Sequence, residues 1–241
     1  MNTQILFFSL ALAFIVFAAG ANATTITIKN NCQRTIWPAT LGGSSQLSIT
    51  GFELAPQGNK SVDIPDGTWI GRFWARDICS TDASGSFTCA TGNCGSGKIE
   101  CNGLSGATPA TLVEFTIRGD GGKDFYDVSN VDGFNIPVSV VPQGGSGDCQ
   151  ESICGVNING DCLPELQFKS GNDVVGCLSG CAKFNEDRFC CTGAFDKPDC
   201  PPTDYSRFFE EKCPKAYSYA KDDKDSTFTC TNPNYLITFC P

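Results

Sequence analysis

The sequence contains no histidine among its 241 residues and only one methionine. Without histidine, neither a Ser-His nor a Cys-His catalytic triad can be assembled. Zinc binding is also disfavoured, because the short cysteine spacings are irregular and do not form paired C-x-x-C motifs. The sequence therefore predicts no metal site and no cofactor.

Basic residues are the minority, with 17 Lys and Arg against 26 Asp and Glu and a formal net charge of −9. An acidic surface repels nucleic acids and anionic membranes, so neither is expected as a partner. The charge instead fits a neutral polar ligand or a cationic one.

Long apolar runs are also scarce, and the first, Ile5 to Phe17, is too short to span a bilayer comfortably. It ends in AAGANA, in which Ala21-Asn22-Ala23 has the small-x-small form of a signal-peptidase site. We predict a cleaved secretory signal over residues 1–23, export of the remaining chain, and no stable membrane insertion.

What the chain has in abundance is cysteine: all 16 lie after residue 23. This even number indicates an oxidising compartment and a disulfide framework, although counting alone cannot choose the pairs. The 26 glycines and 13 prolines favour a turn-rich β protein over a helical one.

The stretch from Thr111 to Val141 carries the first candidate site. Val113, Phe115 and Ile117 alternate with polar residues as in a half-buried strand, so Glu114 points away from the core. Asp127 and Asp132 lie near later turns, and the three carboxylates could line an acidic cleft. The alternative at this point is that they are ordinary solvated acids.

Further elements follow from local patterns. Strands are expected over residues 24–29, 47–54, 68–76, 226–230 and 235–240. In the strand over 68–76, Arg72 lies beside aromatic residues on an open face or caps the sheet as a surface residue. Helical spacing starts at Asp173 as a possible N-cap, with Val174, Cys177, Leu178 and Cys181 on one face, and a second short helix is expected over Thr203 to Lys212. Asn59-Lys60-Ser61 is a weak glycosylation signal.

Several motifs carry a family resemblance. GSFTCATGNCGSGKIEC, from Gly85 to Cys101, resembles the signature of thaumatin-like proteins, a pathogenesis-related plant group, although Asn93 stands where the family usually has Asp. The motifs NNC, GRFWAR, DGFNIPVSV and FCCTGAF extend the resemblance over essentially the whole chain after residue 23.

The resemblance implies a mainly β fold. Its antiparallel β-sandwich core would cover residues 24–78, 102–148 and 214–241, with a small stapled loop region over 79–101. A disulfide-rich lobe with short helices would cover 149–213 and leave a cleft beside the core. The implied disulfides are Cys32–Cys240, Cys79–Cys89, Cys94–Cys101, Cys149–Cys230, Cys154–Cys213, Cys162–Cys177, Cys181–Cys190 and Cys191–Cys200.

Members of this family often carry five charged residues in the cleft. Matched by motif they are Arg72, Glu114, Asp127, Asp132 and Asp222, with the neighbouring Asp223 as the alternative to the last.

The resemblance thus implies a monomeric, antifungal plant defence protein, secreted to the extracellular space (apoplast), that recognises β-1,3-glucan or another fungal cell-wall polysaccharide. One alternative is a weak endo-β-1,3-glucanase, with Glu114 as acid and Asp132 as its partner. The other is a hydrolase inhibitor or surface ligand without catalysis.

Overall fold

The computed structural model describes residues 23–43 and 45–241. Apart from Ala23, the predicted secretory signal lies outside the described residues. None of the helices in these ranges is long and apolar enough to cross a membrane.

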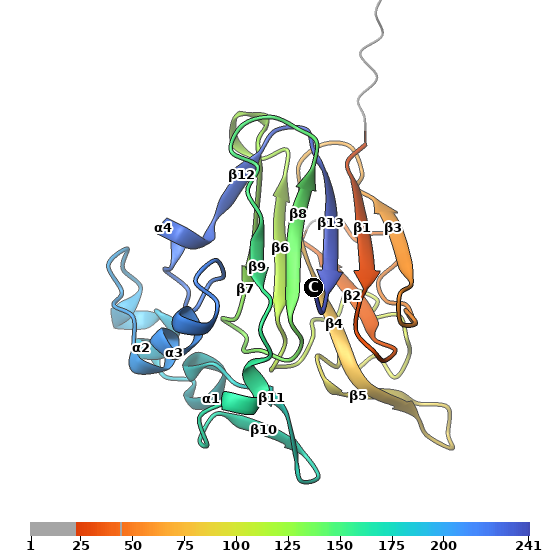
Figure 1. Cartoon of the computed structure of the whole chain (residues 1–241), viewed down its shortest axis with the longest axis vertical. Coiled ribbons are helices and arrows are strands. Elements are labelled where there is room, and N and C mark those ends of the chain that lie inside the picture. The colour runs from red at the N-terminus through yellow and green to blue at the C-terminus, as the bar shows by residue number, and fades with distance from the viewer. Residues whose placement is uncertain (1–22, 44) are drawn as a thin grey trace, which may run out of the picture.

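Two β-sheets form the body of the molecule (Figure 1). The first has the strand order β3-β1-β13-β8-β9. Its pairs are antiparallel except β1 with β13, which run parallel. The bounds of its strands are β1 (Thr25–Asn30), β3 (Asn59–Asp63), β8 (Val138–Gln143), β9 (Ser152–Cys154) and β13 (Asn234–Phe239).

The second sheet has the order β12-β7-β6-β4-β2, and β5 pairs with the far end of the long strand β4. All of its pairs are antiparallel. Its strands are β2 (Trp37–Gly42), β4 (Trp69–Thr81), β5 (Phe87–Thr91), β6 (Leu112–Ile117), β7 (Asp124–Ser129) and β12 (Phe228–Cys230). The mainly β, sandwich-like architecture implied by the resemblance is therefore confirmed.

The core lies between the two sheets. In β6 the predicted alternation holds, because Val113, Phe115 and Ile117 are buried while Glu114 is only half-buried. The Phe115 ring packs edge-on against Tyr235 of the opposite sheet, with ring centroids 4.9 Å apart. Burying each such side chain stabilises the fold by about 1.5–3 kcal/mol. Because these apolar residues must face the core, Glu114, which alternates with them, must lie on the opposite face of the sheet.

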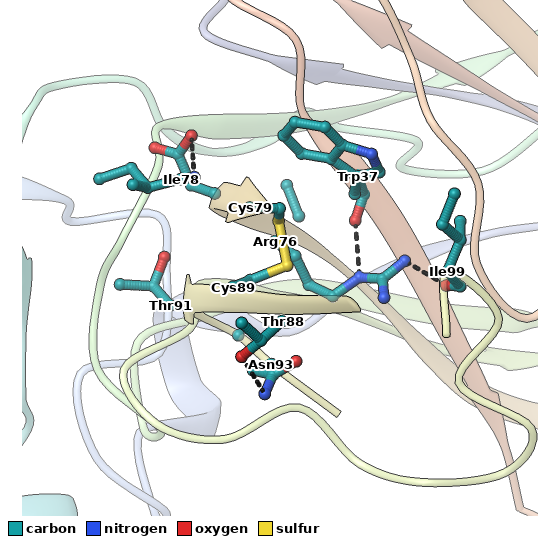
Figure 2. The surroundings of a disulfide bond; sticks show 12 residues. Trp37, Arg76, Ile78, Cys79, Thr88, Cys89, Thr91, Asn93 and Ile99 are labelled. Atoms are coloured by element: carbon teal, nitrogen blue, oxygen red, sulfur yellow. Dashed lines mark hydrogen bonds between the residues drawn. A yellow bond between two sulfur atoms is a disulfide. The ribbon is translucent and has the colours of Figure 1, made fainter. Parts of the chain in front are cut away.

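Eight disulfides cross-link the chain, and no cysteine in the described ranges is free. They join the same cysteines that the resemblance pairs. Cys32–Cys240 ties the end of β1 to the end of β13, across 208 residues of sequence. Cys79–Cys89 joins directly opposite residues of the β4–β5 hairpin (Figure 2).

Arg76 on β4 is fully buried. Its guanidinium donates to the backbone carbonyls of Trp37, at 3.0 Å, and Ile99, at 2.6 Å (Figure 2). Burial lowers the pKa of Arg76 to about 10, so the side chain is still charged at neutral pH. Arg76 therefore holds the loop that contains Ile99 against β2.

A lobe of short elements lies beside the sheets (Figure 1). It contains the hairpin of β10 (Gln167–Ser170) and β11 (Asp173–Cys177), the helices α1 (Gly180–Phe184), α2 (Asp187–Cys190) and α3 (Asp204–Lys212), and the 3-10 turns η2 (Ile158–Asp161) and η3 (Gly193–Phe195). Outside the lobe, the 3-10 turn η1 (Asp120–Gly122) connects β6 to β7, and the short helix α4 (Asp223–Ser226) precedes β12. The predicted helix over Thr203 to Lys212 is confirmed, with Thr203 as N-cap in a capping box and Phe209 buried.

Two local predictions are wrong. The segment that starts at Asp173 is strand β11, not a helix, and the helix begins only at Gly180 with Ser179 as its N-cap. The adjacent β-branched residues Val174 and Val175 favour a strand, and Gly171 with φ +62° makes the turn to β10. Residues 47–54 form no strand, because only isolated bridges hold Gly51 and Leu54 in place.

Candidate functional site

A cavity of about 630 Å³ opens on the face of the second sheet that looks away from the core. Strands β4, β6 and β7 form its floor, and residues 129–132 and 217–223 contribute its sides. The charged side chains that line it are Arg72, Glu114, Asp127, Asp132 and Asp223. We call this cavity the cleft.

Three of these charged residues form a row across the sheet. Arg72 on β4 lies directly opposite Glu114 on β6, which in turn lies directly opposite Asp127 on β7. Directly opposed residues of an antiparallel pair have Cβ atoms about 4.5–5.5 Å apart and project from the same face. The strand register therefore places one cation and two acids side by side on the floor of the cleft.

Burial and neighbouring charges set the protonation of the acids in the cleft. Burial raises the pKa of Glu114, an effect that Arg72 partly offsets and that Asp132 reinforces. Burial also raises the pKa of Asp132, and the charge of Arg72 only partly offsets this rise. Because Arg72 acts on both carboxyls while its Nη2 donates to the Ser105 hydroxyl at 2.7 Å, it is held where it moderates the repulsion between them.

Asp127 has the most perturbed carboxyl of the cleft. Burial, followed by the charges of Glu114 and Asp223, holds its pKa well above the usual range. Its Oδ1 atom is buried and has no hydrogen-bond partner among the described residues. Leaving a charged oxygen buried and unpaired is costly, so this carboxyl favours its neutral form.

Tyr217 and Asp223 supply the opposite side of the cleft. The Tyr217 hydroxyl donates to Asp223 Oδ1 at 2.7 Å and also shares a hydrogen bond with the Thr227 hydroxyl. Burial raises the pKa of Tyr217, so the phenol remains neutral and orients the Asp223 carboxylate.

The structure brings four of the five predicted cleft residues together but not Asp222. The Oδ2 atom of Asp222 instead accepts hydrogen bonds from the backbone amide and hydroxyl of Ser218, at 3.0 and 2.8 Å. These bonds turn the Asp222 side chain into its own loop, and the next residue, Asp223, lines the cleft in its place.

Sequence reasoning missed Ser129 and Tyr217, both of which line the cleft. Ser129 follows Asp127 by two residues on β7, so strand periodicity alone could have placed it on the same face. Tyr217 is 90 residues further along the chain than Asp127, and no local pattern connects the two.

The cleft is suited to a polar, uncharged ligand. Its carboxyl groups accept hydrogen bonds, its arginine donates them, and the ring of Phe125 adds an apolar surface to the lining. No group of three or more possible metal ligands (His, Cys, Asp or Glu) is arranged to hold a cation within residues 23–43 and 45–241.

Comparison with known proteins gives consistent matches. The model of the thaumatin family matches residues 30–241. Among sequence relatives, a protein of Prunus avium named glucan endo-1,3-beta-glucosidase is 55% identical over 246 aligned positions, covering 100% of both chains. Pathogenesis-related protein 5 of Arabidopsis thaliana is 53% identical over 234 positions, covering 96% of each chain.

A solved structure shares the fold at much lower sequence similarity. It is a laminaripentaose-producing β-1,3-glucanase in complex with laminaritetraose, with a TM-score of 0.57 and 12% identity. The match covers 91% of this chain and 99% of the glucanase chain. At this level of identity the likeness establishes the fold alone.

Proposed function

This chain belongs to the thaumatin family, and from that premise we propose that it is a secreted, antifungal defence protein whose cleft binds β-1,3-glucan. A relative that is 53% identical is named as a pathogenesis-related protein, which supports the defence role. Export to the extracellular space fits the predicted signal and the eight disulfides, since such bonds persist in oxidising compartments. We propose that the protein acts there as a monomer.

The observation that carries the proposal is the row of Arg72, Glu114 and Asp127 on the floor of a cavity of about 630 Å³. Binding sites for small ligands typically enclose about 300–1,000 Å³ and contain a few polar groups that fix the orientation of the ligand. Sugar hydroxyls both donate and accept hydrogen bonds, so a row that combines one cationic donor, Arg72, with two carboxyl groups, Glu114 and Asp127, matches them. Phe125 offers a ring on which a sugar face can stack.

Hydrolysis of the bound glucan is the second candidate, and it has its own support. A glycosidase needs one carboxyl that keeps its proton and a second that acts as nucleophile or base. Burial raises the pKa of Glu114, as a proton donor requires, and Asp132 is close enough to perturb it. The 55% identical relative named as a glucan endo-1,3-beta-glucosidase also favours this activity.

The test measures binding and hydrolysis together, by pull-down on insoluble β-1,3-glucan and by reducing ends released from laminarin. Glu114→Gln preserves the shape but removes the transferable proton, so hydrolysis should fall about 10²–10⁴-fold while glucan binding changes little. Arg72→Ala should weaken binding under either candidate, because it leaves the acids of the cleft without their cation.

Glu53→Gln is the matched control, since Glu53 is exposed and does not line the cleft. If the wild-type protein does not bind insoluble glucan in the pull-down, the binding proposal is refuted. Hydrolysis that survives Glu114→Gln unchanged would exclude Glu114 as the acid and point to a contaminating glucanase.

Glycosylation at Asn59 remains a separate prediction. Asn59 is exposed at the first position of β3, so an oligosaccharide there would project into solvent. Mass spectrometry of the secreted protein before and after glycosidase treatment tests it.

A further inference from the structure

A second cavity, of about 610 Å³, lies in the disulfide-rich lobe and shares no lining residue with the cleft. Helices α1, α2 and α3 surround it, together with Leu163 and Glu165. We propose that this lobe cavity is a second saccharide-binding site, which takes an uncharged oligosaccharide and holds it without cleaving it.

Three aromatic rings gather at this cavity. Phe184 of α1, Phe189 of α2 and Tyr205 of α3 have centroids 5.1 to 5.5 Å apart, and each ring is only half-buried. The disulfide Cys181–Cys190 fixes α1 against α2 and so sets the positions of the two phenylalanines.

On one side, the rings contact a glycine, Gly180, which has no side chain. A Cβ atom added at Gly180 would lie 3.2 Å from Tyr205 Cβ and 3.4 Å from Phe189 Cδ1. Tyr205 and Phe189 therefore pack directly on the backbone of Gly180, where any larger residue would displace them.

The charges around the rings are nearly balanced. Arg188 pairs with Glu186 at 2.9 Å, and its guanidinium lies 4.4 Å from the centroid of Phe189. Arg207 pairs with Asp204 at 2.6 Å. With Glu165 the lining holds two cations and three acids. Each guanidinium already has a carboxylate partner and the acids outnumber the cations, so an anionic ligand would gain little from this lining.

These features together favour a sugar over other uncharged ligands. The apolar faces of a pyranose ring stack on aromatic rings, and its hydroxyls both donate and accept hydrogen bonds. The paired guanidinium and carboxylate groups offer donors and acceptors side by side. A proline-rich peptide also packs on aromatic rings, but its backbone has too few donors to use the three carboxylates.

The experiment is an NMR titration of the isotopically labelled full-length protein with laminarihexaose, with chitohexaose and with hexaproline. We expect saturable shifts of backbone amides in segments 163–165, 184–189 and 203–207 with at least one saccharide and none with hexaproline. Amides of β4, β6 and β7 report on the cleft separately, so failure of one site is distinguishable from failure of the other.

Phe184→Leu removes the flat ring but keeps most of the apolar volume, and it should weaken saccharide binding at the lobe cavity about tenfold. Phe195→Leu is the matched control, because Phe195 is an exposed aromatic residue outside both cavities. Arg72→Ala in the cleft should leave the shifts of the lobe segments unchanged.

Three results would overturn the proposal. They are no shift in the lobe segments with either saccharide, equal affinity of wild type and Phe184→Leu at this cavity, and a response of the lobe segments to hexaproline instead of saccharide.

Discussion

The length of chain that each disulfide closes should determine how much it stabilises the protein. Cys32–Cys240 spans 208 residues of sequence, whereas Cys191–Cys200 spans only 9. Replacing both cysteines of one bond by alanine removes that constraint from the unfolded chain. The two replacements are well matched, because each includes one cysteine with positive φ, Cys240 at +56° and Cys191 at +54°.

The loop-entropy relation gives the expected sizes. Closing the longer loop restricts the unfolded chain by about 5 kcal/mol at 25 °C, and closing the shorter one by about 2.5 kcal/mol. For a protein of this size, 1 kcal/mol shifts the melting temperature by about 2–4 °C. We therefore expect losses of about 10–20 °C for the Cys32/Cys240 replacement and about 5–10 °C for the Cys191/Cys200 replacement.

The assay is reversible urea or thermal unfolding of both double variants and the wild type, with the other seven disulfides verified as intact. Equal losses of melting temperature for the long and the short loop would refute the reasoning. That result would place the stabilisation in local packing of the cysteines instead of in restriction of the unfolded chain.

Two further predictions concern buried charges. The folded-state pKa of Asp127 is raised above its unfolded value of about 3.9. The contribution of Asp127 to the free energy of unfolding is therefore most favourable at low pH and is lost as the pH rises. In urea unfolding, Asp127→Asn should be more stable than wild type above neutral pH, and the difference should vanish near pH 4. Arg76→Met leaves two partly buried carbonyl oxygens without the guanidinium donor, and each should lower the free energy of unfolding by about 1–3 kcal/mol at most. An unchanged free energy of unfolding would show that these bonds contribute nothing.

The sheets were predictable because strand periodicity is local. In β6 the alternation of Val113, Phe115 and Ile117 with polar residues identified both the strand and the outward face of Glu114. The row with Arg72 and Asp127 depends on the register of three strands. Glu114 and Asp127 lie in consecutive strands and could be grouped as candidate cleft acids from the sequence alone. Arg72 lies in a separate, earlier strand, and only the family resemblance added it to them in advance.

The failures have equally specific causes. The spacing of Val174 and Cys177 matched a helix, but pairing of β11 with β10 overrode that pattern. The sequence could not choose between Asp222 and Asp223 as the fifth charged residue, because the choice depends on the hydrogen bonds from Ser218 that hold the side chain of Asp222. Strand periodicity alone also places Arg76 on the same face as the exposed Ile70, but the loop that contains Ile99 covers the Arg76 end of that face and buries the side chain.

The lobe cavity had no sequence signal. Its rings come from three short helices, and their proximity depends on a disulfide and on contact with Gly180. Phe184, Phe189 and Tyr205 follow no shared periodicity along the chain, so only the folded structure shows them as a group.

The affinity of the cleft for a defined β-1,3-linked oligosaccharide tests the central claim most directly. Calorimetric titration with laminarihexaose should be carried out in protein carrying Phe184→Leu, so that the cleft dominates the signal. Adding Arg72→Ala should weaken binding about tenfold or more, because a hydrogen bond from a charged donor typically contributes about 1.5–3 kcal/mol. Adding the exposed control Glu53→Gln should leave the affinity unchanged. Equal affinity in all three proteins would contradict the account.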